Sequence, residues 1–228
     1  MKNLAEKLKN PVWYSLKETH NNFAINYNGV LFYKPEINNF GAFKDERITK
    51  KAMEDYSKLS DKFFLVSESS TPNYDSEKIQ LEKKIDGCQL VLEKFIDYKI
   101  TEEIIELTEK YIDEIYDLIW LVMPGFYQKK GFYMGKFFGI FKENKLVAIS
   151  GQRMQTNDFI EVSSVVTHPE HTKRGYAKQL ITYTTKEIIK ENKLPMLHTN
   201  KGNKAIPLYE KLGYKLTRDM NWWLFSKK

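Results

Sequence analysis

The stretch FIEVSSVVTHPEHTKRGYAKQL, residues 159–180, decides the fold of this chain. Its first half is an alternating, β-branched run that ends at His168-Pro169, which predicts a strand followed by a turn. Gly175 then opens an amphipathic segment with helical periodicity. The predicted order is strand, tight loop, helix. Since the first N–H groups of a helix lack partners and its start carries a partial positive charge, this loop is suited to hold a phosphate-like anion.

The composition excludes several classes of protein. The 228 residues are 42% hydrophobic and 14% aromatic, which is enough for one large or two small globular domains. The formal net charge of +6 favours anionic ligands, but the sequence has no long Lys/Arg run and no nucleic-acid motif, so we expect no nucleic-acid partner. Cys88 is the only cysteine, which excludes an internal disulfide, and without a Cys/His cluster we expect no metal site.

The sequence contains no candidate membrane segment. The first ten residues lack the apolar core of a signal peptide, and no apolar run approaches the length that spans a bilayer. We therefore expect a soluble, cytoplasmic protein that does not bind membranes. The sequence does not determine the oligomeric state, and a homodimer stays open.

The pattern of elements divides the chain in two. Residues 1–87 contain scattered strand-like runs and one predicted helix, Thr49–Lys58, without any chemical motif, and we interpret them as a smaller N-terminal α/β domain. Residues 88–228 start with a strand from Gln89 to Phe95 and a helical pattern from Glu102 to Val122. The fold class is therefore mixed α/β. The remaining predictions are strands at 137–141, 146–153, 161–167, 195–199, 214–217 and 221–225 and helices at 175–191 and 205–212.

Two motifs resemble the GCN-related N-acetyltransferase (GNAT) superfamily. The loop TKRGYA, 172–177, lacks the Walker and dinucleotide-binding patterns, but Gly175 and Ala177 match the GNAT signature Arg/Gln-x-x-Gly-x-Gly/Ala, with Thr172 in place of the Arg or Gln. About thirty residues downstream, AIPLYEKLGY, 205–214, resembles the closing motif A-I-x-L-Y-E-K-L-G-F of the superfamily. Taken alone, the first loop is equally consistent with an ordinary strand-to-helix turn.

The resemblance extends to an FR47-like bacterial subgroup. GQRM at 151–154, EVS at 161–163, THPE at 167–170 and NPVW at 10–13 are similar to segments of that subgroup. The resemblance implies a GNAT-type central mixed, mostly antiparallel sheet flanked by helices, with residues 88–228 as the acetyltransferase domain. It also implies acetyl-CoA as co-substrate and N-acetyltransferase activity.

The resemblance also implies where acetyl-CoA binds. The loop would hold the pyrophosphate through backbone amides, and the end of the preceding strand would contact the pantetheine arm. The superfamily has an Asn three residues before the Ala of the closing motif; Gly202 stands there, so Asn203 takes that role or caps the next helix, or does both. The residues implied in acetyl-CoA binding are Val165, Val166, Thr167, Lys173, Arg174, Gly175, Tyr176, Ala177, Lys178 and Asn203.

Three residues are candidates for the chemistry. Tyr209 corresponds to the tyrosine that protonates the departing thiolate in related enzymes, unless it only packs its helix against the sheet. Glu161 lies thirteen residues before Arg174, the spacing of the catalytic glutamate in the histone-acetylating branch, and would deprotonate the amine. The alternatives for Glu161 are a solvent-facing position or an ion pair with Arg153. His198 on the next strand is the rival base, or else a core histidine with satisfied hydrogen bonds, and water is a third base.

The predicted reaction is direct attack of a primary amine on the thioester carbonyl of acetyl-CoA, which an amide near Val166 would polarise. The amine would belong to a small molecule or a peptide, and segment 123–136 would overhang its site. One alternative is a non-catalytic, CoA-binding regulatory protein that keeps the GNAT fold, because Thr172 and the displaced Asn203 depart from the signature. A nucleotide-phosphate-binding domain without CoA is another.

Overall fold

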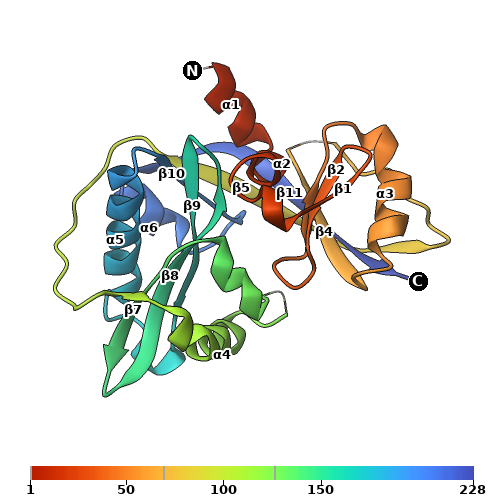
Figure 1. Cartoon of the computed structure of the whole chain (residues 1–228). Coiled ribbons are helices and arrows are strands. Elements are labelled where there is room, and N and C mark those ends of the chain that lie inside the picture. The colour runs from red at the N-terminus through yellow and green to blue at the C-terminus, as the bar shows by residue number, and fades with distance from the viewer. Residues whose placement is uncertain (1, 69, 126) are drawn as a thin grey trace.

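The computed structural model describes residues 2–68, 70–125 and 127–228. Within these residues the strands form one 11-stranded sheet in the order β1-β2-β3-β4-β11-β5-β10-β9-β8-β7-β6 (Figure 1). Neighbouring strands are antiparallel except for the parallel pairs β3/β4 and β9/β10. The predicted fold class is confirmed: a mixed α/β protein with a mostly antiparallel sheet flanked by helices.

The strands are β1 (Ala24–Tyr27), β2 (Val30–Tyr33), β3 (Phe40–Ala42), β4 (Lys62–Ser67), β5 (Ile79–Leu92), β6 (Ile105–Leu107), β7 (Phe137–Lys142), β8 (Lys145–Gln155), β9 (Phe159–Thr167), β10 (Leu194–Asn200) and β11 (Tyr214–Lys227). The helices are α1 (Lys2–Lys9), α2 (Pro11–Lys17), α3 (Thr49–Tyr56), α4 (Ile112–Val122), α5 (Tyr176–Lys190) and α6 (Ile206–Lys211).

The long strands β5 and β11 connect the two ends of the sheet. They pair with each other along nearly their whole length, from Tyr214 opposite Leu92 to Lys227 opposite Ile79. β11 also pairs with β4, and β5 with β10, so this pair links the N-terminal strands to the others. β5 runs through the predicted domain boundary between residues 87 and 88, and that boundary stays a prediction.

Two sequence predictions about these strands are wrong. β5 begins at Ile79, ten residues before Gln89, and β11 is one strand where two were expected. The polar residues between the two expected strands stay in β11 because β5 supplies backbone partners on both sides of a bulge between Leu216 and Arg218. Pairing between segments far apart in the sequence decides these lengths, and local propensity does not encode it.

The helix expected from Glu102 is shorter than predicted. Residues 105–107 form the edge strand β6, and α4 begins only at Ile112. Leu107 of β6 is buried and packs in one cluster with Ile119 and Phe137. Burial of Leu107 at the sheet edge therefore outweighs the helical pattern of this segment.

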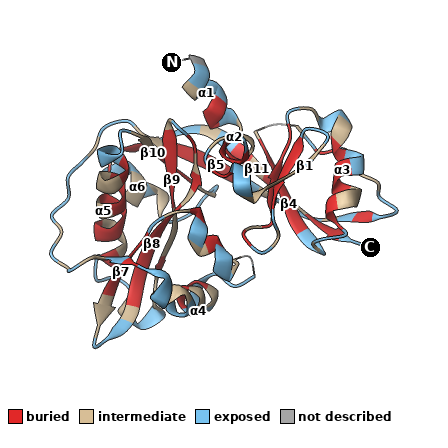
Figure 2. Ribbon diagram, in the orientation of Figure 1, coloured by how far each residue is buried: buried red, intermediate tan, exposed pale blue. Residues whose placement is uncertain are grey.

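Helices α4 and α5 cover opposite faces of the sheet, and Figure 2 shows the buried strand residues between them. Ile119 of α4 packs in a cluster with Phe137, whereas Leu180 of α5 packs in a different cluster with the adjacent Phe138. Since successive strand residues point to opposite faces, the two helices lie on the two sides of β7 and β8.

The N-terminal helices close the structure at the other strands. α3 packs on β2 and β4, where the rings of Tyr56 and Phe32 stack with centroids 4.1 Å apart. Val12 of α2 lies in a buried cluster with Met154 and Phe159, so α2 contacts β8 and β9. The N-terminal part is thereby attached to the strands that carry the candidate site.

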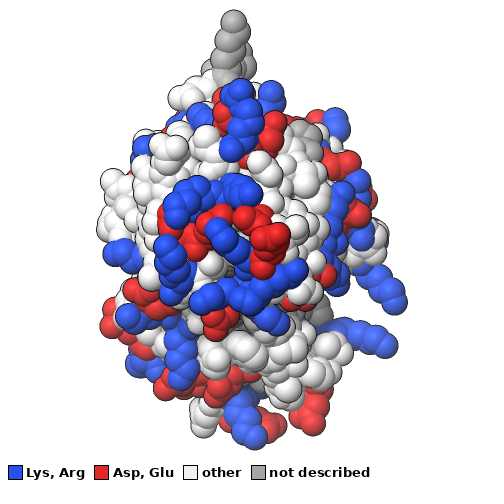
Figure 3. Space-filling model, turned by 90° about the vertical axis from the view of Figure 1, so that its right-hand side faces the viewer, with Lys and Arg blue, Asp and Glu red and all other residues white. Residues whose placement is uncertain are grey.

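The surface at the α3 end mixes charges of both signs. Figure 3 shows Lys and Arg side chains interspersed with Asp and Glu. Lys51 and Lys58 pair with Asp55, and Lys78 pairs with Glu54. Exposed pairs of this kind contribute little to stability. In the described part of the chain, no helix is both long and apolar enough to cross a membrane.

Candidate active site

The parallel strands β9 and β10 separate shortly after they start. Their register contains three pairs, and the last joins Met196 to Glu161. Beyond this pair β10 follows β5 as far as Asn200, while β9 follows β8 as far as Thr167. The sheet therefore opens between the C-terminal halves of β9 and β10.

A β-bulge on β9 lies beside this opening. Val166 is opposite Ile149 and Ser163 is opposite Gly151, so β9 holds one residue more than β8 in this interval. Ser164 absorbs the extra residue with a φ of 50°, in the left-handed region that non-glycine residues seldom adopt. The bulge breaks the regular alternation of β9, and Ser163, Ser164 and Val165 all line the space in this opening.

The loop between β9 and α5 has the open geometry that an anion requires. Lys173 and Gly175 have φ values of 62° and 79°, and α5 begins at the next residue, Tyr176. A Cβ added to Gly175 would meet no heavy atom within 4 Å, so the space in front of the helix start is free. The first N–H groups of an α-helix have no partners within the helix and point toward its N-terminal end, which is here the end at Gly175.

The side chains around this loop divide into exposed cations and one buried ring. Lys173 and Arg174 are exposed, and neither forms an ion pair with any residue that the structure describes. Lys178 lies with its Nζ 3.5 Å from the ring centroid of Tyr98. The ring of Tyr176 is buried in the core under α5, so this residue has only its backbone to offer a ligand.

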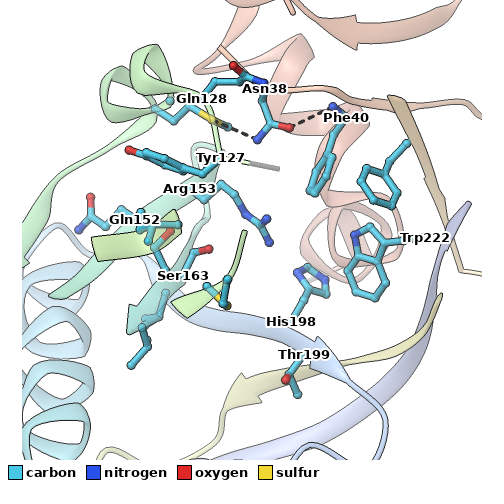
Figure 4. A pocket seen from close by; sticks show the side chains of 18 of the residues that line it. Asn38, Phe40, Tyr127, Gln128, Gln152, Arg153, Ser163, His198, Thr199 and Trp222 are labelled. Carbon is cyan, nitrogen blue, oxygen red and sulfur yellow. Dashed lines mark hydrogen bonds between the residues drawn. The ribbon is translucent and has the colours of Figure 1, made fainter. Parts of the chain in front are cut away.

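A cavity of about 400 Å³ occupies the opening (Figure 4). Its walls come from β8, β9 and β10, from α6, from the connection between α4 and β7, and from the N-terminal part with β11. Among the predicted site residues, the structure brings Val165, His198, Asn203 and Tyr209 to this cavity. Glu161, Val166, Thr167 and residues 173–178 lie outside its lining.

The segment expected to overhang the acceptor contributes directly to this cavity. Met123, Tyr127, Gln128, Gly131 and Met134 all line it. Phe126, which belongs to the same segment, lies outside the described residues. The arrangement places the connection between α4 and β7 across the cavity from β10.

Tyr209 combines a packing contact with access to the cavity. It lies on α6 and packs against the core cluster beneath that helix, as expected for a tyrosine that packs its helix against the sheet. It also lines the cavity. Burial raises the pKa of the Tyr209 phenol, so the hydroxyl keeps its proton at neutral pH and above.

Glu161 is buried in a network of hydrogen bonds. Its side chain is 0% exposed, and Arg153 contacts both oxygens, with Nε 2.7 Å from Oε2 and Nη2 2.8 Å from Oε1. His198 Nδ1 lies 2.8 Å from Oε1, and the Met154 N–H lies 3.3 Å from Oε2. Burial alone would raise the pKa of Glu161, but the charge and hydrogen bonds of Arg153, together with the hydrogen bond from His198, hold it well below its usual range.

The ion pair with Arg153 is thus one of the alternatives considered for Glu161 from the sequence. A general base needs a free lone pair and a pKa near the working pH. Both oxygens of Glu161 are occupied, and its pKa is shifted away from neutrality. Its role as the base stays a prediction that this environment disfavours.

His198 also has both ring nitrogens engaged. Gln89 Nε2 donates to the Leu8 carbonyl at 2.8 Å and lies 3.1 Å from His198 Nε2. Since a carbonyl only accepts, this contact orients the amide, and we assign His198 Nε2 as acceptor and Nδ1–H as donor to Glu161. In this assignment His198 is neutral and has no free lone pair for an amine.

Asn203 shapes the turn that precedes α6. Its Oδ1 accepts the Ala205 N–H at 2.8 Å, and its Nδ2 donates to Thr199 Oγ1. The same residue is exposed and lines the cavity. Ala205 occupies the N-cap position of α6, so the prediction that Asn203 itself caps this helix is wrong; Asn203 stabilises the turn two residues earlier, and its place at the cavity leaves the binding role as a prediction.

The sequence did not single out the wall opposite β9. Phe40 and Trp222 line the cavity, and neither is among the predicted site residues. Both are also largely buried, at 8% exposure. No local sequence pattern marks these two residues, because β3 and β11 reach this opening only through long-range strand pairing. Arg153, which was considered only as a partner of Glu161, lines the cavity as well.

In the described part of the chain, no group of three or more His, Cys, Asp or Glu side chains is arranged to hold a metal ion.

Known proteins share this architecture. Residues 137–224 match the family of FR47-like proteins. A structure from Novosphingobium aromaticivorans, assigned to the acetyltransferases of the GNAT family, is 25% identical, covers 97% of this chain and 98% of its own, and has a TM-score of 0.84. A GCN5-related N-acetyltransferase from Kribbella flavida is 11% identical, covers 95% of both chains and has a TM-score of 0.63. A GCN5-related N-acetyltransferase-like protein from Streptococcus suis is 13% identical, covers 90% of this chain and 82% of its own, and has a TM-score of 0.57. No curated protein sequence matches the chain.

Proposed function

Since this chain belongs to the GNAT superfamily and carries an FR47-like region, we propose that it transfers an acetyl group from acetyl-CoA to a primary amine by direct attack. The observation that carries the proposal is the cavity between β9 and β10, where the β9 bulge and Tyr209 face the same space. The loop at Gly175 follows directly on β9, so a ligand held there extends toward this cavity.

Acetyl-CoA binds in this proposal with its pyrophosphate at the start of α5. The free amides of that helix and the exposed cations of Lys173 and Arg174 favour an anion at this position. The pantetheine arm then follows the edge of β9 that β10 leaves unpaired beyond Glu161. Val165, Val166 and Thr167 belong to this edge, and Val165 lines the cavity together with Asn203.

The chemistry has three parts. The neutral amine attacks the thioester carbonyl and forms the C–N bond, and the oxyanion accepts a hydrogen bond from a β9 amide near Val166. The C–S bond then breaks, and Tyr209 gives its proton to the departing thiolate. The proton of the attacking amine leaves through water in the cavity, because Glu161 and His198 are both engaged in other hydrogen bonds, and water returns a proton to the Tyr209 phenolate. Glu161 and His198 act in this scheme as positioning residues for Arg153 and β10.

The test is release of free thiol from acetyl-CoA with a panel of amines. We expect turnover by the wild type and a kcat for Tyr209→Phe lower by roughly 10²- to 10⁴-fold, since the phenol acts as general acid. The affinity of Tyr209→Phe for CoA, measured by calorimetry, should stay close to that of the wild type and serves as the control.

Two outcomes would contradict the proposal. Tight CoA binding without turnover of any amine would favour the non-catalytic, CoA-binding alternative. Displacement of CoA by ATP in a thermal-shift competition would favour a general nucleotide-phosphate site.

A further inference from the structure

The charge of the cavity wall limits the kind of amine that it accepts. Among the lining residues that the structure describes, none is Asp, Glu or Lys, and Arg153 is the one Arg. Glu161, the ion-pair partner of Arg153, is 0% exposed and lies outside the lining. A cationic acceptor such as a polyamine would therefore bury its additional ammonium groups without a counter-charge, which is costly.

Arg153 is held in place with donors left over. Two of the five N–H groups of a guanidinium are used by Glu161, and no other hydrogen bond of Arg153 occurs in the described part of the chain. Its side chain keeps 24% exposure. Figure 4 shows the guanidinium pointing into the cavity beside His198, whereas the polar ends of Tyr127 and Gln152 point away from it.

The cavity wall on the side of Arg153 that faces the N-terminal part is largely apolar. The guanidinium carbon lies 5.1 Å from the ring centroid of Phe40. Trp222, Phe64 and Ile85 continue this wall, and Figure 4 shows Trp222 and Phe40 next to His198. One fixed cation within an apolar wall is suited to a molecule that has a single anionic group on an apolar body.

We propose that the acceptor is an amine that also carries a carboxylate and an apolar side chain, as an α-amino acid with a large apolar side chain does. This inference rests on the proposed function. The carboxylate accepts hydrogen bonds from the free N–H groups of Arg153, and the apolar side chain lies against Phe40 and Trp222. The amino group then faces the β9 bulge and the thioester. The cavity volume of about 400 Å³ suits a small molecule of this size.

The first experiment measures binding to the whole protein and needs no turnover. Calorimetry in excess CoA compares 3-phenylpropanoate with 3-phenylpropanamide, which differ in the charge of one end. We expect the carboxylate to bind roughly ten- to a hundredfold more tightly, as a charge-assisted pair with Arg153 implies. Equal or weaker binding of the carboxylate overturns the inference. If CoA itself does not bind, the proposed function is refuted. The comparison of 3-phenylpropanoate with 3-phenylpropanamide still tests the inference in that case.

The second experiment measures acetyl transfer to L-phenylalanine, phenethylamine and spermidine, with each kcat/KM expressed per neutral amine. We expect L-phenylalanine to exceed phenethylamine by roughly ten- to a hundredfold and spermidine to be the poorest acceptor. A preference for spermidine or for phenethylamine overturns the inference while it supports the proposed transferase activity.

A double variant assigns the preference to Arg153. Arg153→Gln/Glu161→Gln removes the cation without leaving an unpaired buried carboxylate, and it should lose most of the preference for the carboxylate in both assays. The matched control is Arg47→Gln/Asp45→Asn, which removes an exposed Arg–carboxylate pair and should keep the preference. A double variant at 153 and 161 that folds and keeps the preference overturns the role of Arg153. If it does not fold, the two wild-type comparisons decide the inference.

Discussion

Arg153 and Glu161 form a two-point ion pair in which only one partner reaches the cavity. Nε lies 2.7 Å from Oε2 and Nη2 lies 2.8 Å from Oε1. The carboxylate is fully buried, whereas the guanidinium is part-exposed and lines the cavity. The glutamate therefore fixes the arginine, and the arginine meets whatever fills the site.

The first prediction concerns the stability that this pair controls. Arg153→Met leaves the Glu161 carboxylate buried without its counter-charge, so we expect the free energy of unfolding to fall by about 3–5 kcal/mol. Arg153→Gln/Glu161→Gln keeps two neutral hydrogen-bonding groups and should be clearly more stable than the single variant. Urea denaturation followed by circular dichroism measures both. A single variant as stable as the wild type would show that the pair is not a buried charge pair in solution.

The second prediction tests the anion site at the start of α5. Gly175→Ala introduces no clash, but its φ of 79° strains an alanine and its Cβ enters the space in front of the helix. We expect the dissociation constant of CoA to rise roughly tenfold, a change typical of one misplaced charged hydrogen bond.

Gly29→Ala, between β1 and β2 and outside the proposed site, is the matched control for this variant. Gly29 has a φ of 95°, and an added Cβ would meet only Ile48 Cδ1 at an ordinary contact distance of 3.4 Å, so the backbone strain of the two variants is comparable. Calorimetric titration with CoA compares them, and thermal denaturation measures the strain. Equal weakening of CoA binding by both variants would argue against a pyrophosphate site at Gly175.

The sequence predicts the parts of the site that local patterns encode. The β-branched run, the glycine of the loop and the amphipathic helix predict β9, the turn at Gly175 and α5 within one or two residues. Tyr209 was identified from a motif, and the structure brings it to the cavity. Local periodicity and turn chemistry act over a few residues, which is why these elements could be read directly.

The far wall of the cavity could not be predicted in the same way. Trp222 reaches the cavity because β11 pairs with β5, and these strands are separated by more than a hundred residues. The burial of Glu161 depends on Arg153 from β8 and on His198 from β10, whose positions follow from strand register. A register shift of one residue would turn each of these side chains to the other face, and single-sequence patterns do not fix register across distant strands.

The third prediction concerns the pH dependence of acetyl transfer. With Glu161 and His198 engaged, the acceptor loses its proton to water, so kcat/KM should rise with pH until the amine is neutral. Since burial raises the pKa of Tyr209 above its ordinary value of 10.0, its general-acid role should persist through the alkaline range up to that value. The pH profiles of two acceptors whose amines differ in pKa provide the test. The rising limb should shift with the amine; a limb at the same pH for both would identify a titrating base on the enzyme.

The fourth prediction concerns His20, which connects the N-terminal part to the cavity wall. His20 Nε2 donates to the carbonyl of Met134 at 2.9 Å, and Nδ1 lies 2.9 Å from Tyr33 Oη and 3.0 Å from Ser15 Oγ. Burial lowers the pKa of His20 from 6.5 to about 4. Between these pH values His20 is protonated in the unfolded chain and neutral in the folded protein. The free energy of unfolding therefore falls as the pH falls through this window. The lowered pKa corresponds to a loss of about 3 kcal/mol in the free energy of unfolding, and this loss is complete near pH 4.

Urea denaturation of the wild type and His20→Gln from pH 7.5 to 5 isolates the contribution of His20, because carboxylates titrate mainly below that range. The wild type should lose stability more steeply with falling pH than the variant, and parallel curves would exclude a buried neutral histidine beside Met134.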